Sequence, residues 1–445
     1  MGGLRFYLAL WISKIIAIII NIVAKERGTN LPGAVALKID PCFIKHLKGI
    51  DPEKTVLITG TNGKSSVTNL VHHILTGAGH RVISNLGGAN MTAGVAVPLL
   101  CNASFAGKVK CDFVVMETDE RYIARIRQQL PAKYLAVTNI QKDQVQRNGE
   151  PGFVREKIRE AICPDMTVFL NNDEPNAVSL GTTGAARTIR YGITPHERSF
   201  AGNTDFFAVT EPCPVCHNGI TFHKYNLENI GAYRCPVCGF ANDPQPDYLT
   251  STVSFENREL VLNGKAYPFC CNRTEFLYGY TLAIAVALEL GIPETEVAAA
   301  LESYDRIVGQ GDLHDAGKKQ IRFFYIKQEN SETLQSAINA LSTVEEPKTV
   351  ILGLDEYIDF YPPYVNGCYL FDCSFDALRR SGVNRCICTA PALGSLGAIR
   401  FLYDGFDPDT IAVLPDSRET TLTDALRHDT AENIYLIEEI PFWKQ

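Results

Sequence analysis

A short glycine-rich loop is the part of the sequence whose residue types indicate chemistry most directly. It consists of Gly60, Thr61, Asn62, Gly63, Lys64, Ser65 and Ser66. The loop follows a β-branched run at 55–59 and precedes a segment with apolar residues at helical spacing. Backbone amides at a helix start bind phosphate, a lysine neutralises the β- and γ-phosphates, and a serine can hold Mg²⁺. We expect a phosphate loop rather than a chance glycine-rich turn, although the strict Walker pattern needs glycine in place of Ile58.

Four cysteines in two CPVC knuckles give the second chemical signal. The spacing is C-x₂-C-x₁₈-C-x₂-C, and the predicted ligands are Cys213, Cys216, Cys235 and Cys238. This spacing is typical of a tetrahedral zinc ribbon, and four sulfur ligands leave no open position, so the zinc would be structural. Two disulfides are the alternative. The other ten cysteines are scattered along the chain, which indicates a reducing cytoplasm and argues against disulfides. The nearby His217 and His223 are given no role.

Glu117 is the third candidate, because it lies near the end of the apolar run VVMET at 114–118. In a parallel sheet, such a strand delivers a carboxylate to the same edge as the phosphate loop. A carboxylate there could hold Mg²⁺. An acidic residue that ends a strand is equally able to cap the next helix, so from the residues alone both interpretations remain open.

The elements that would position these residues alternate between strand and helix patterns. Strand-like runs at 55–59, 114–118, 134–139 and 167–172 are separated by helical patterns such as FVREKIREAI. This alternation predicts a parallel, doubly wound α/β sheet. A Cys/Pro-rich insertion at about 206–250 interrupts it, and short strands (252–262) and an apolar helix (276–290) follow.

After residue 304 the alternation restarts with IRFFYI, ETLQSAINAL, TVILGL, CYLFD, RCICTA and TIAVLP. We predict a lead-in at 1–50, a central domain at 51–308 and a C-terminal α/β domain at 309–445. The boundary would lie near 309–317. Length and composition agree with globular domains of this kind. A chain of 445 residues with 46% hydrophobic and 21% charged residues is unlike collagen, a coiled coil or a disordered chain. A net charge of −8 without a basic run argues against a nucleic-acid partner.

The apolar segment at 6–24 is nearly long enough to span a bilayer. It lacks a small-x-small cleavage site, so we do not expect a removed signal peptide. Lys14 lies in its middle, and Tyr7, Lys14 and Asn21 would form one polar stripe on a helix. Three arrangements remain open: a helix packed on the body of the protein or on a partner, contact with a membrane surface, and a true span.

Several blocks of sequence resemble the Mur ligases, and among them the MurT branch, the ATP-dependent subunit of lipid II isoglutaminyl synthase. TGTNGKSS at 59–66 is similar to the ATP loop of Mur ligases and folylpolyglutamate synthase. NLGGANM at 85–91, RGTNLPG at 27–33 and NNDEP at 171–175 resemble MurT blocks. VTNIQKDQVQRNGE at 137–150 is also similar, and Gln144 favours MurT because most Mur ligases have Asp-His there. The resemblance covers residues 1–300 well.

The resemblance implies a fold and a set of site residues. It implies a Mur-ligase-type central P-loop α/β domain with an inserted four-cysteine zinc ribbon, followed by a Rossmann-like α/β C-terminal domain. It also implies that Lys64 and Glu117 are catalytic and that Ser65 and Glu117 hold Mg²⁺. For Glu117 it favours the metal role, while the helix cap stays the alternative. Besides the loop itself, the implied nucleotide contacts are Asn90, Asn139, Asn172 and Asp173. Lys157 lies near a lysine that many Mur ligases carbamylate, but its spacing from Asp143 differs and an exposed lysine is expected.

The activity implied is ATP-dependent amidation of the α-carboxyl of D-glutamate in the lipid II stem peptide, through an acyl phosphate, giving D-isoglutamine. Ammonia would come from a GatD-like glutaminase subunit, since the chain has no recognisable Cys/His nucleophile pair. The protein would be cytoplasmic, with peripheral membrane contact through residues 6–24 on the inner face left open.

The C-terminal third departs from the MurT pattern. The F-G-R-x-E block is matched by 308–312 without its arginine, V-K-N-P by 326–329, and the paired asparagines of the 276–290 helix are replaced, with Gly279 in one position. The aspartate that supports the glutaminase has no direct match near 366–369. Asp355 is our catalytic candidate for it, and Asp359 and Asp372 are the other substitutes.

Three other functions remain open from the sequence. The chain could be a Mur-type or folylpolyglutamate-type ligase that adds an amino acid and works alone. It could be a non-catalytic, nucleotide-binding paralogue. It could also be a nucleotide-dependent switch that hydrolyses ATP without a carboxylate substrate.

Overall fold

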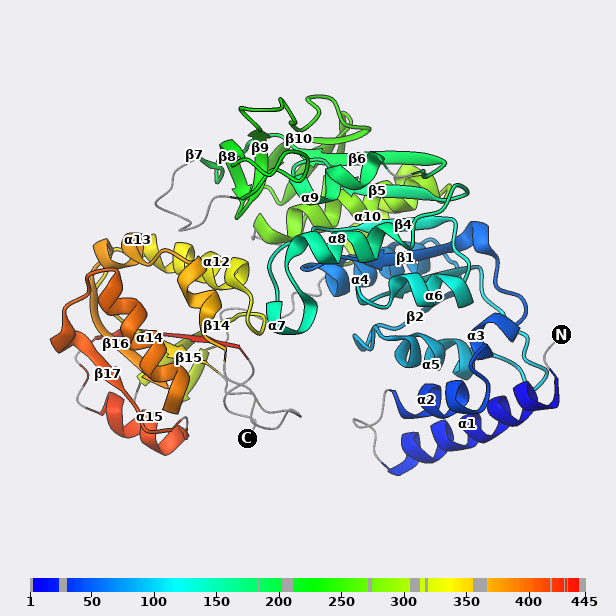
Figure 1. The fold of residues 1–445 in the computed structure, drawn as a ribbon, viewed down its shortest axis with the longest axis horizontal. Helices are drawn as coiled ribbons and strands as arrows, with labels where there is room; N and C mark the ends of the chain where they lie inside the picture. Colours follow the sequence, from blue (N-terminus) through cyan, green and yellow to red (C-terminus); the bar gives the residue numbers. More distant parts are fainter. Residues whose placement is uncertain are drawn as a thin grey trace. The chain divides into compact units, whose positions relative to one another are not determined.

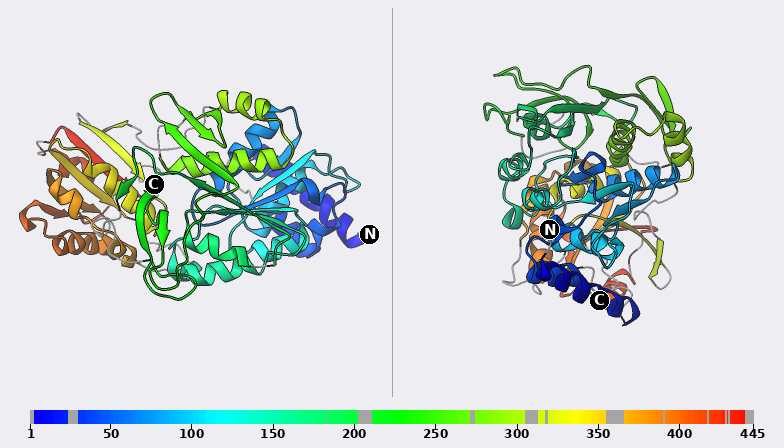
Figure 2. Two further views of the ribbon diagram at one scale, coloured as in Figure 1. Left: turned by 90° about the horizontal axis from the view of Figure 1, so that it is seen from above. Right: turned by 90° about the vertical axis from the view of Figure 1, so that its right-hand side faces the viewer.

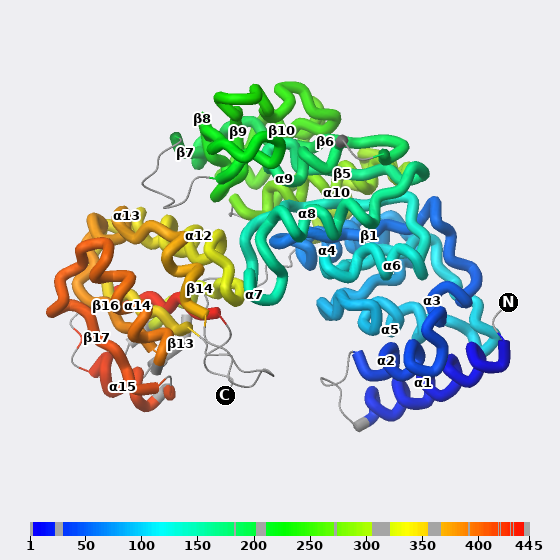
Figure 3. Tube along the Cα trace, viewed as in Figure 1, coloured from blue at the N-terminus to red at the C-terminus, as the bar shows by residue number. Residues whose placement is uncertain are grey.

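The computed structural model describes most of the chain. The described residues are 3–23, 30–182, 184–201, 211–270, 274–304, 313–316, 319–354, 366–389, 391–416, 418–427, 429 and 431–439. The chain forms two compact units (Figures 1 and 3). Unit 1 comprises residues 1–141, 150–200 and 213–305, and unit 2 comprises 142–149, 201–212 and 306–445. The first fifty residues are therefore part of the same compact unit as the phosphate loop.

Unit 1 is built on a large, mainly parallel sheet. Its strands are β1 (Thr55–Thr59), β2 (Val82–Ser84), β3 (Phe113–Glu117), β4 (Tyr134–Val137), β5 (Thr167–Asn171), β6 (Arg187–Ile193), β10 (Tyr248–Ser254), β11 (Glu259–Leu262) and β12 (Lys265–Pro268). Their order is β12-β11-β10-β6-β5-β4-β1-β3-β2. All pairs from β2 to β10 are parallel, and β10-β11-β12 is antiparallel. The predicted parallel α/β sheet is confirmed.

Strand β1 lies at the point in the sheet where the strand order predicts a ligand site. All five of its residues are buried, as expected for a strand covered on both faces. Its neighbours β3 and β4 lie on opposite sides of it, so the chain winds away from β1 in two directions. In open α/β sheets, ligands bind outside the carboxyl ends of the strands at such a switch point. The glycine-rich loop begins at this end of β1.

Helices cover both faces of the sheet (Figure 2). Val56 and Ile58 point to one face, and their core includes α4 (Lys64–Gly77), α10 (Leu277–Glu289) and α11 (Glu294–Glu302). Leu57 points to the other face, because side chains alternate along a strand. The helices on that second face are α5 (Thr92–Asn102), α6 (Ile123–Gln129), α8 (Pro151–Arg159) and α9 (Pro175–Val178).

The N-terminal apolar segment forms α1 (Leu4–Val23), followed by α2 (Leu31–Ile39) and α3 (Phe43–His46). Residues Leu4–Ile22 have a mean hydropathy of 1.7 and are long enough to cross a bilayer. Even so, α1 packs against α2 and α5, and Phe6, Ala9 and Leu10 are buried. Of the three arrangements, packing on the body of the protein is the one that the structure has. Residues 27–29 of the RGTNLPG block lie outside the described residues.

The Cys/Pro-rich insertion forms a small sheet between β6 and β10. Its strands are β7 (Phe200–Ala201), β8 (Thr221–Leu227) and β9 (Ile230–Arg234), in the order β7-β8-β9. Its apolar core joins Ile220, Phe222 and Tyr233 to two of the predicted zinc ligands, Cys213 and Cys235. The described part of the insertion has so small a core that its fold must depend on other contacts.

Unit 2 is a second α/β domain. Its sheet contains β13 (Leu313–Ala316), β14 (Lys319–Tyr325), β15 (Lys348–Gly353), β16 (Val383–Thr389), β17 (Ile411–Val413) and β18 (Asn433–Glu438), in the order β13-β14-β18-β15-β16-β17. Only the β13-β14 pair is antiparallel. Its α-helices are α7 (Val145–Asn148), α12 (Ser331–Ser342), α13 (Asp376–Arg380), α14 (Pro391–Tyr403) and α15 (Glu419–Leu426). This arrangement agrees with the predicted C-terminal α/β domain.

Short 3-10 helices connect several of these elements. They are η1 (Pro52–Lys54), η2 (Ser179–Thr182), η3 (Thr274–Phe276), η4 (Cys368–Asp372) and η5 (Pro408–Thr410). The run CYLFD is η4, so it belongs to the connections of unit 2 and contributes no strand to its sheet.

Candidate nucleotide site and zinc centre

The glycine-rich loop takes a conformation that only glycine allows at two positions. Gly60 has φ +127°, and a Cβ added there would lie 2.3 Å from Thr138 Oγ1. Gly63 is the N-cap of α4 and has φ +81°. A side chain there would have open space around it, but this left-handed backbone conformation is strained for residues other than glycine. The first amides of a helix have no intrahelical acceptor. The loop and the start of α4 can therefore offer N–H groups to an anion.

A segment that follows β4 braces the loop. The Thr61 amide donates to the Asn139 carbonyl at 2.8 Å, and the Asn62 amide donates to Asn139 Oδ1 at 2.9 Å. Asn62 Nδ2 also donates to Gln141 Oε1 at 3.0 Å. Asn139 is predicted to contact nucleotide, and in the structure its side chain holds the loop backbone. Gln141 belongs to the same sequence motif, but no local pattern predicts that it braces the loop.

Lys64 is buried and held by three oxygen atoms. Its Nζ donates to Glu120 Oε2 at 3.1 Å, to the Thr61 carbonyl at 3.2 Å, and to the Gly60 carbonyl. The Lys64–Glu120 pair is an ion pair with both side chains largely buried. Sequence reasoning did not single out Glu120. The signal was present, since Glu120 lies three residues beyond Glu117 at the same strand end.

Glu117 lies beside the loop serine. Its Oε2 accepts a hydrogen bond from Ser65 Oγ at 2.7 Å, and its Oε1 accepts one from Asn90 Nδ2 at 3.0 Å. Asn85 clamps the Glu117 backbone with two hydrogen bonds of 2.8 Å. The next helix, α6, has Tyr122 as its N-cap, without a side-chain cap. Glu117 therefore does not cap that helix, and the metal interpretation is the one its contacts fit.

The chemistry of this cluster suits a hard cation beside a phosphate. Ser65 and Glu117 supply a hydroxyl and a carboxylate, which are the oxygen ligands that Mg²⁺ takes in phosphate loops. Asp119 is engaged elsewhere, in an ion pair with Arg121 at 2.9 Å. Burial opposes its charge, but the hydrogen bonds from Arg121 outweigh burial and lower the pKa of Asp119 below its ordinary value.

Asn172 and Asp173 lie further along the sheet and hold protein groups. Asp173 accepts hydrogen bonds from the Ile193 amide and the Tyr278 hydroxyl, each at 2.8 Å. Asn172 pairs with the backbone of Asp243 through bonds of 2.9 and 3.0 Å. Burial raises the pKa of Asp173 to about 6. Their predicted role toward nucleotide stays a prediction, and the contacts that the structure gives them fasten the insertion and α10.

Other predicted residues have contacts of their own. Lys157 lies on α8 and pairs with Glu160 at 2.8 Å. In unit 2, Lys142 pairs with Asp372 at 3.2 Å. Asp355, Asp359 and residues 308–312 lie outside the described residues.

The Asp143-Gln144 pair belongs to unit 2. Asp143 is buried and accepts hydrogen bonds from Lys327 Nζ at 2.6 Å and Asn330 Nδ2 at 3.1 Å. Gln144 has a left-handed backbone, with φ +44°, and its amide donates to the Glu329 carbonyl at 3.2 Å. The run matched to V-K-N-P is thus where the Asp-Gln motif makes its contacts.

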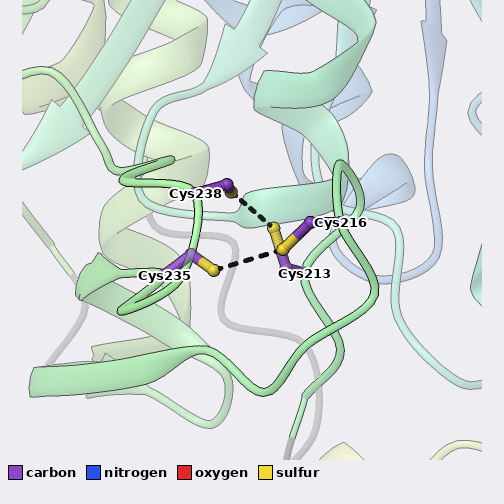
Figure 4. Close-up of side chains that lie close together, drawn as sticks. All are labelled: Cys213, Cys216, Cys235 and Cys238. Carbon is purple, nitrogen blue, oxygen red and sulfur yellow. Dashed lines mark hydrogen bonds between the residues drawn. The ribbon is translucent and has the colours of Figure 1, made fainter.

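The four predicted zinc ligands lie together. Figure 4 shows the four sulfur atoms turned toward one another, all within 4.8 Å. The Cys213–Cys238 and Cys216–Cys235 sulfur pairs are 3.6 and 3.5 Å apart. Zn–S bonds of about 2.3 Å in a tetrahedron put sulfur atoms about 3.8 Å apart. These distances fit one zinc ion and are far too long for disulfides, so the disulfide alternative is wrong here.

One thiol of the cluster is biased toward thiolate before a metal binds, whereas the neighbouring thiols raise the pKa of Cys238. Hydrogen bonds from the side chain and backbone of Asn218 lower the pKa of Cys216 to about 6. Thiolate, rather than thiol, is the form that binds a metal.

Comparison with known proteins shows which proteins this chain is similar to. Residues 58–234 match the Mur ligase middle domain. The lipid II isoglutaminyl synthase (glutamine-hydrolyzing) subunit MurT of Staphylococcus aureus is 26% identical over 82% of this chain and 80% of its own length. The MurT of Streptococcus pneumoniae is 27% identical over 79% of this chain and 77% of its own. The chain therefore contains a match to the Mur ligase middle domain and is similar to MurT proteins over about four fifths of its length.

Solved structures support the same fold. A pseudomurein peptide ligase type C from Methanothermus fervidus has a TM-score of 0.65 and 19% identity, covering 89% of this chain and 78% of its own. The MurF ligase of Thermotoga maritima in complex with ADP has a TM-score of 0.51 and 13% identity, covering 92% of this chain and 80% of its own. The predicted Mur ligase fold is confirmed, and the family supports the prediction of a carbon–nitrogen, amide-forming ligase.

The geometry of the loop predicts how substitutions of Lys64 and Glu117 should change ATP turnover. Lys64→Ala should lower ATP turnover at least about a hundredfold, the effect of removing one preorganised charge. Glu117→Gln should lower Mg²⁺-dependent turnover as much and leave nucleotide binding measurable by calorimetry. Lys157→Ala is the matched control, because this lysine lies on α8, where it pairs with Glu160 and lies over the Phe153 ring, and the variant should keep wild-type turnover. Wild-type turnover by Lys64→Ala would contradict the loop assignment.

The buried Lys64–Glu120 pair predicts a stability effect that nucleotide reverses. Glu120→Gln should lower the free energy of unfolding by about 3 kcal/mol, since a buried lysine loses its carboxylate partner. Saturating Mg-ATP should narrow the difference from wild type, because the phosphates then face the same ammonium. The measurement is denaturant unfolding with and without Mg-ATP. A difference that nucleotide leaves unchanged would mean that Lys64 does not meet the phosphates.

The sulfur geometry predicts about one zinc per chain by metal analysis. Cys213→Ser should lower the yield of folded protein more than the specific rate of the protein that survives, because the metal stabilises the insertion. Cys368→Ser, at an exposed cysteine outside the cluster, is the control and should change neither. A fully stable protein without zinc would reject the structural role.

Proposed function

We propose that this protein is the ATP-dependent subunit of a lipid II isoglutaminyl synthase. It would convert the α-carboxyl of D-glutamate in the stem peptide to the amide of D-isoglutamine, through an acyl phosphate. The observation that carries the proposal is coverage: the similarity to the S. aureus MurT extends over 82% of this chain, which is more than unit 1 contains, and so reaches into unit 2. The Asp143-Gln144 motif agrees with it.

The site residues suit phosphoryl transfer to a carboxylate. Lys64 is the one cation among the described residues that touches the loop carbonyls, and it would turn from Glu120 toward the β- and γ-phosphates. Ser65 and Glu117 would hold Mg²⁺, which would neutralise charge on the transferring group. Asn85 and Asn90 fix the position of Glu117 before the ligand arrives. Asn139 keeps the loop in register.

The nitrogen donor would be ammonia from a GatD-like glutamine amidotransferase subunit. MurT is by name one subunit of a glutamine-hydrolysing enzyme, which implies a partner. Asp355, Asp359 and Asp372 remain the candidates for the carboxylate that supports that partner. Asp372 already pairs with Lys142, so it would have to exchange this partner to serve. A cytoplasmic location follows from the same proposal.

A stand-alone ligase that adds an amino acid is the second candidate. UDP-N-acetylmuramoylalanine–D-glutamate ligases from Sphingopyxis alaskensis and Novosphingobium aromaticivorans are 30% and 32% identical over 31% and 53% of this chain. They match over only 29% and 48% of their own length. These identities are higher than those to MurT, which favours shared catalytic chemistry in the matched residues. Because the match covers less than half of each ligase, it gives no support for a shared acceptor.

The test is an amidation assay. The purified chain, given ATP, Mg²⁺, ammonium and a lipid II analogue with D-glutamate at the second position, should form D-isoglutamine. The product should be about one mass unit lighter than the substrate, because NH₂ replaces OH. With glutamine as the nitrogen source, the reaction should need the second subunit. Ammonium is the informative arm, since it bypasses the partner.

The contrary outcomes separate the alternatives. Incorporation of D-glutamate or another amino acid in place of ammonia would establish the stand-alone ligase. ATP hydrolysis that ignores the muropeptide would point to a switch, and no turnover with intact nucleotide binding would point to a non-catalytic paralogue.

A further inference from the structure

Helix α1 leaves an unusually apolar face uncovered. Its exposed large side chains are Leu4, Leu8, Trp11, Ile12, Ile15, Ile18, Ile19 and Ile22. At 100° per residue, these eight positions fall within one arc of about 120°. Ile15 and Ile19 are each more than half exposed. A contiguous apolar face of this kind marks a surface that something covers.

The opposite face of α1 is already used. Phe6, Ala9 and Leu10 are buried, and Ser13 is fully buried among them. Lys14 lies beside this face, where its Nζ donates to the Cys101 carbonyl at 3.3 Å. A transmembrane orientation would strip α1 from α2 and α5 and carry Lys14 into hydrocarbon. The structure therefore favours a helix whose exposed face lies along a binding surface over a helix that crosses a bilayer.

The apolar face continues beyond the helix. Trp11 Nε1 donates to the Phe105 carbonyl at 3.0 Å, and the Phe105 ring is 68% exposed. Trp and Phe at such an edge suit the boundary between acyl chains and headgroups. The exposed surface thus combines a row of isoleucines with aromatic residues at its rim.

The charge around this face differs from that of the whole protein. Residues 1–50 contain seven Lys and Arg and two Asp and Glu, whereas the whole chain has a net charge of −8. Arg5, Lys38, Lys45 and Lys48 are exposed in this segment. A positively charged segment that carries an apolar face complements an anionic lipid surface. Two copies of this chain docked through α1 would instead bring two positive segments together.

We propose that α1 binds flat on the surface of an anionic lipid bilayer, with its exposed apolar face inserted and the exposed residues Arg5, Lys38, Lys45 and Lys48 at the headgroups. This inference goes beyond the proposed function and does not depend on it, because the ligand is the bilayer itself. Should the protein act on a lipid-linked peptide, the same contact would raise the local concentration of substrate.

The test uses the full chain and vesicles without muropeptide. The protein should float with vesicles of phosphatidylcholine mixed with phosphatidylglycerol and much less with phosphatidylcholine alone. Added salt should weaken the binding, because part of it is electrostatic. The double variant Ile15→Ser/Ile19→Ser should lose at least about tenfold in vesicle partitioning, and Lys45→Ala about fivefold.

Matched controls lie elsewhere on the chain. Ile399→Ser changes a half-exposed isoleucine of unit 2, and Lys265→Ala an exposed lysine of β12. Both should partition like wild type. Amidation of a soluble muropeptide by the Ile15→Ser/Ile19→Ser variant should also match wild type, which separates this test from that of the proposed function.

Three outcomes would overturn the proposal. Equal binding to neutral and anionic vesicles that resists salt would indicate a span. A dimer of the wild type that becomes a monomer in the Ile15→Ser/Ile19→Ser variant would assign the face to a second copy. Vesicle binding that the variant retains would place the lipid contact elsewhere.

Discussion

Burial of charge at the end of the central strands is the constraint on which the site depends. Lys64, Glu117 and Glu120 are each less than a tenth exposed, and a buried charge is costly unless it is paired and hydrogen-bonded. The neighbours meet this requirement: Ser65 and Asn90 donate to Glu117, and Glu120 pairs with Lys64. Removing Glu120 leaves the Lys64 ammonium without a carboxylate partner, and removing Ser65 or Asn90 takes away one of the two donors to Glu117. The loop conformation and the carboxylates are therefore one interdependent unit.

A third buried carboxylate plays a structural part. Asp173 joins β5 to the Ile193 amide, to Tyr278 of α10 and to Asn242 beyond β9. The ribbon has a small core of its own, so these bonds and the cysteine cluster together explain how a short insertion holds one conformation. Because burial raises the pKa of Asp173 to about 6, its ionisation near neutral pH works against folding. The hydrogen bonds that its carboxylate accepts offset part of that cost.

The sequence predicted features that are local and missed those that depend on tertiary contact. The loop, the zinc ligands and the strand at 55–59 follow from spacing and periodicity within a few residues. Gln141 and Glu120 act through groups 79 and 56 positions away in the chain, which no local pattern reveals. Likewise, the apolar segment at 6–24 allowed three arrangements, because hydropathy measures the composition of a helix and not which face its neighbours cover.

The formal charges of the site indicate how its ligands must arrive. Lys64 carries one positive charge, while Glu117 and Glu120 carry two negative ones, and Asp119 and Arg121 cancel each other. The described cluster is thus negative by one unit, and a polyphosphate alone would be repelled. A divalent cation held by Ser65 and Glu117 would reverse the sign. Nucleotide and metal should therefore bind as a pair, with Lys64 released from Glu120 only when phosphate replaces that carboxylate as its partner.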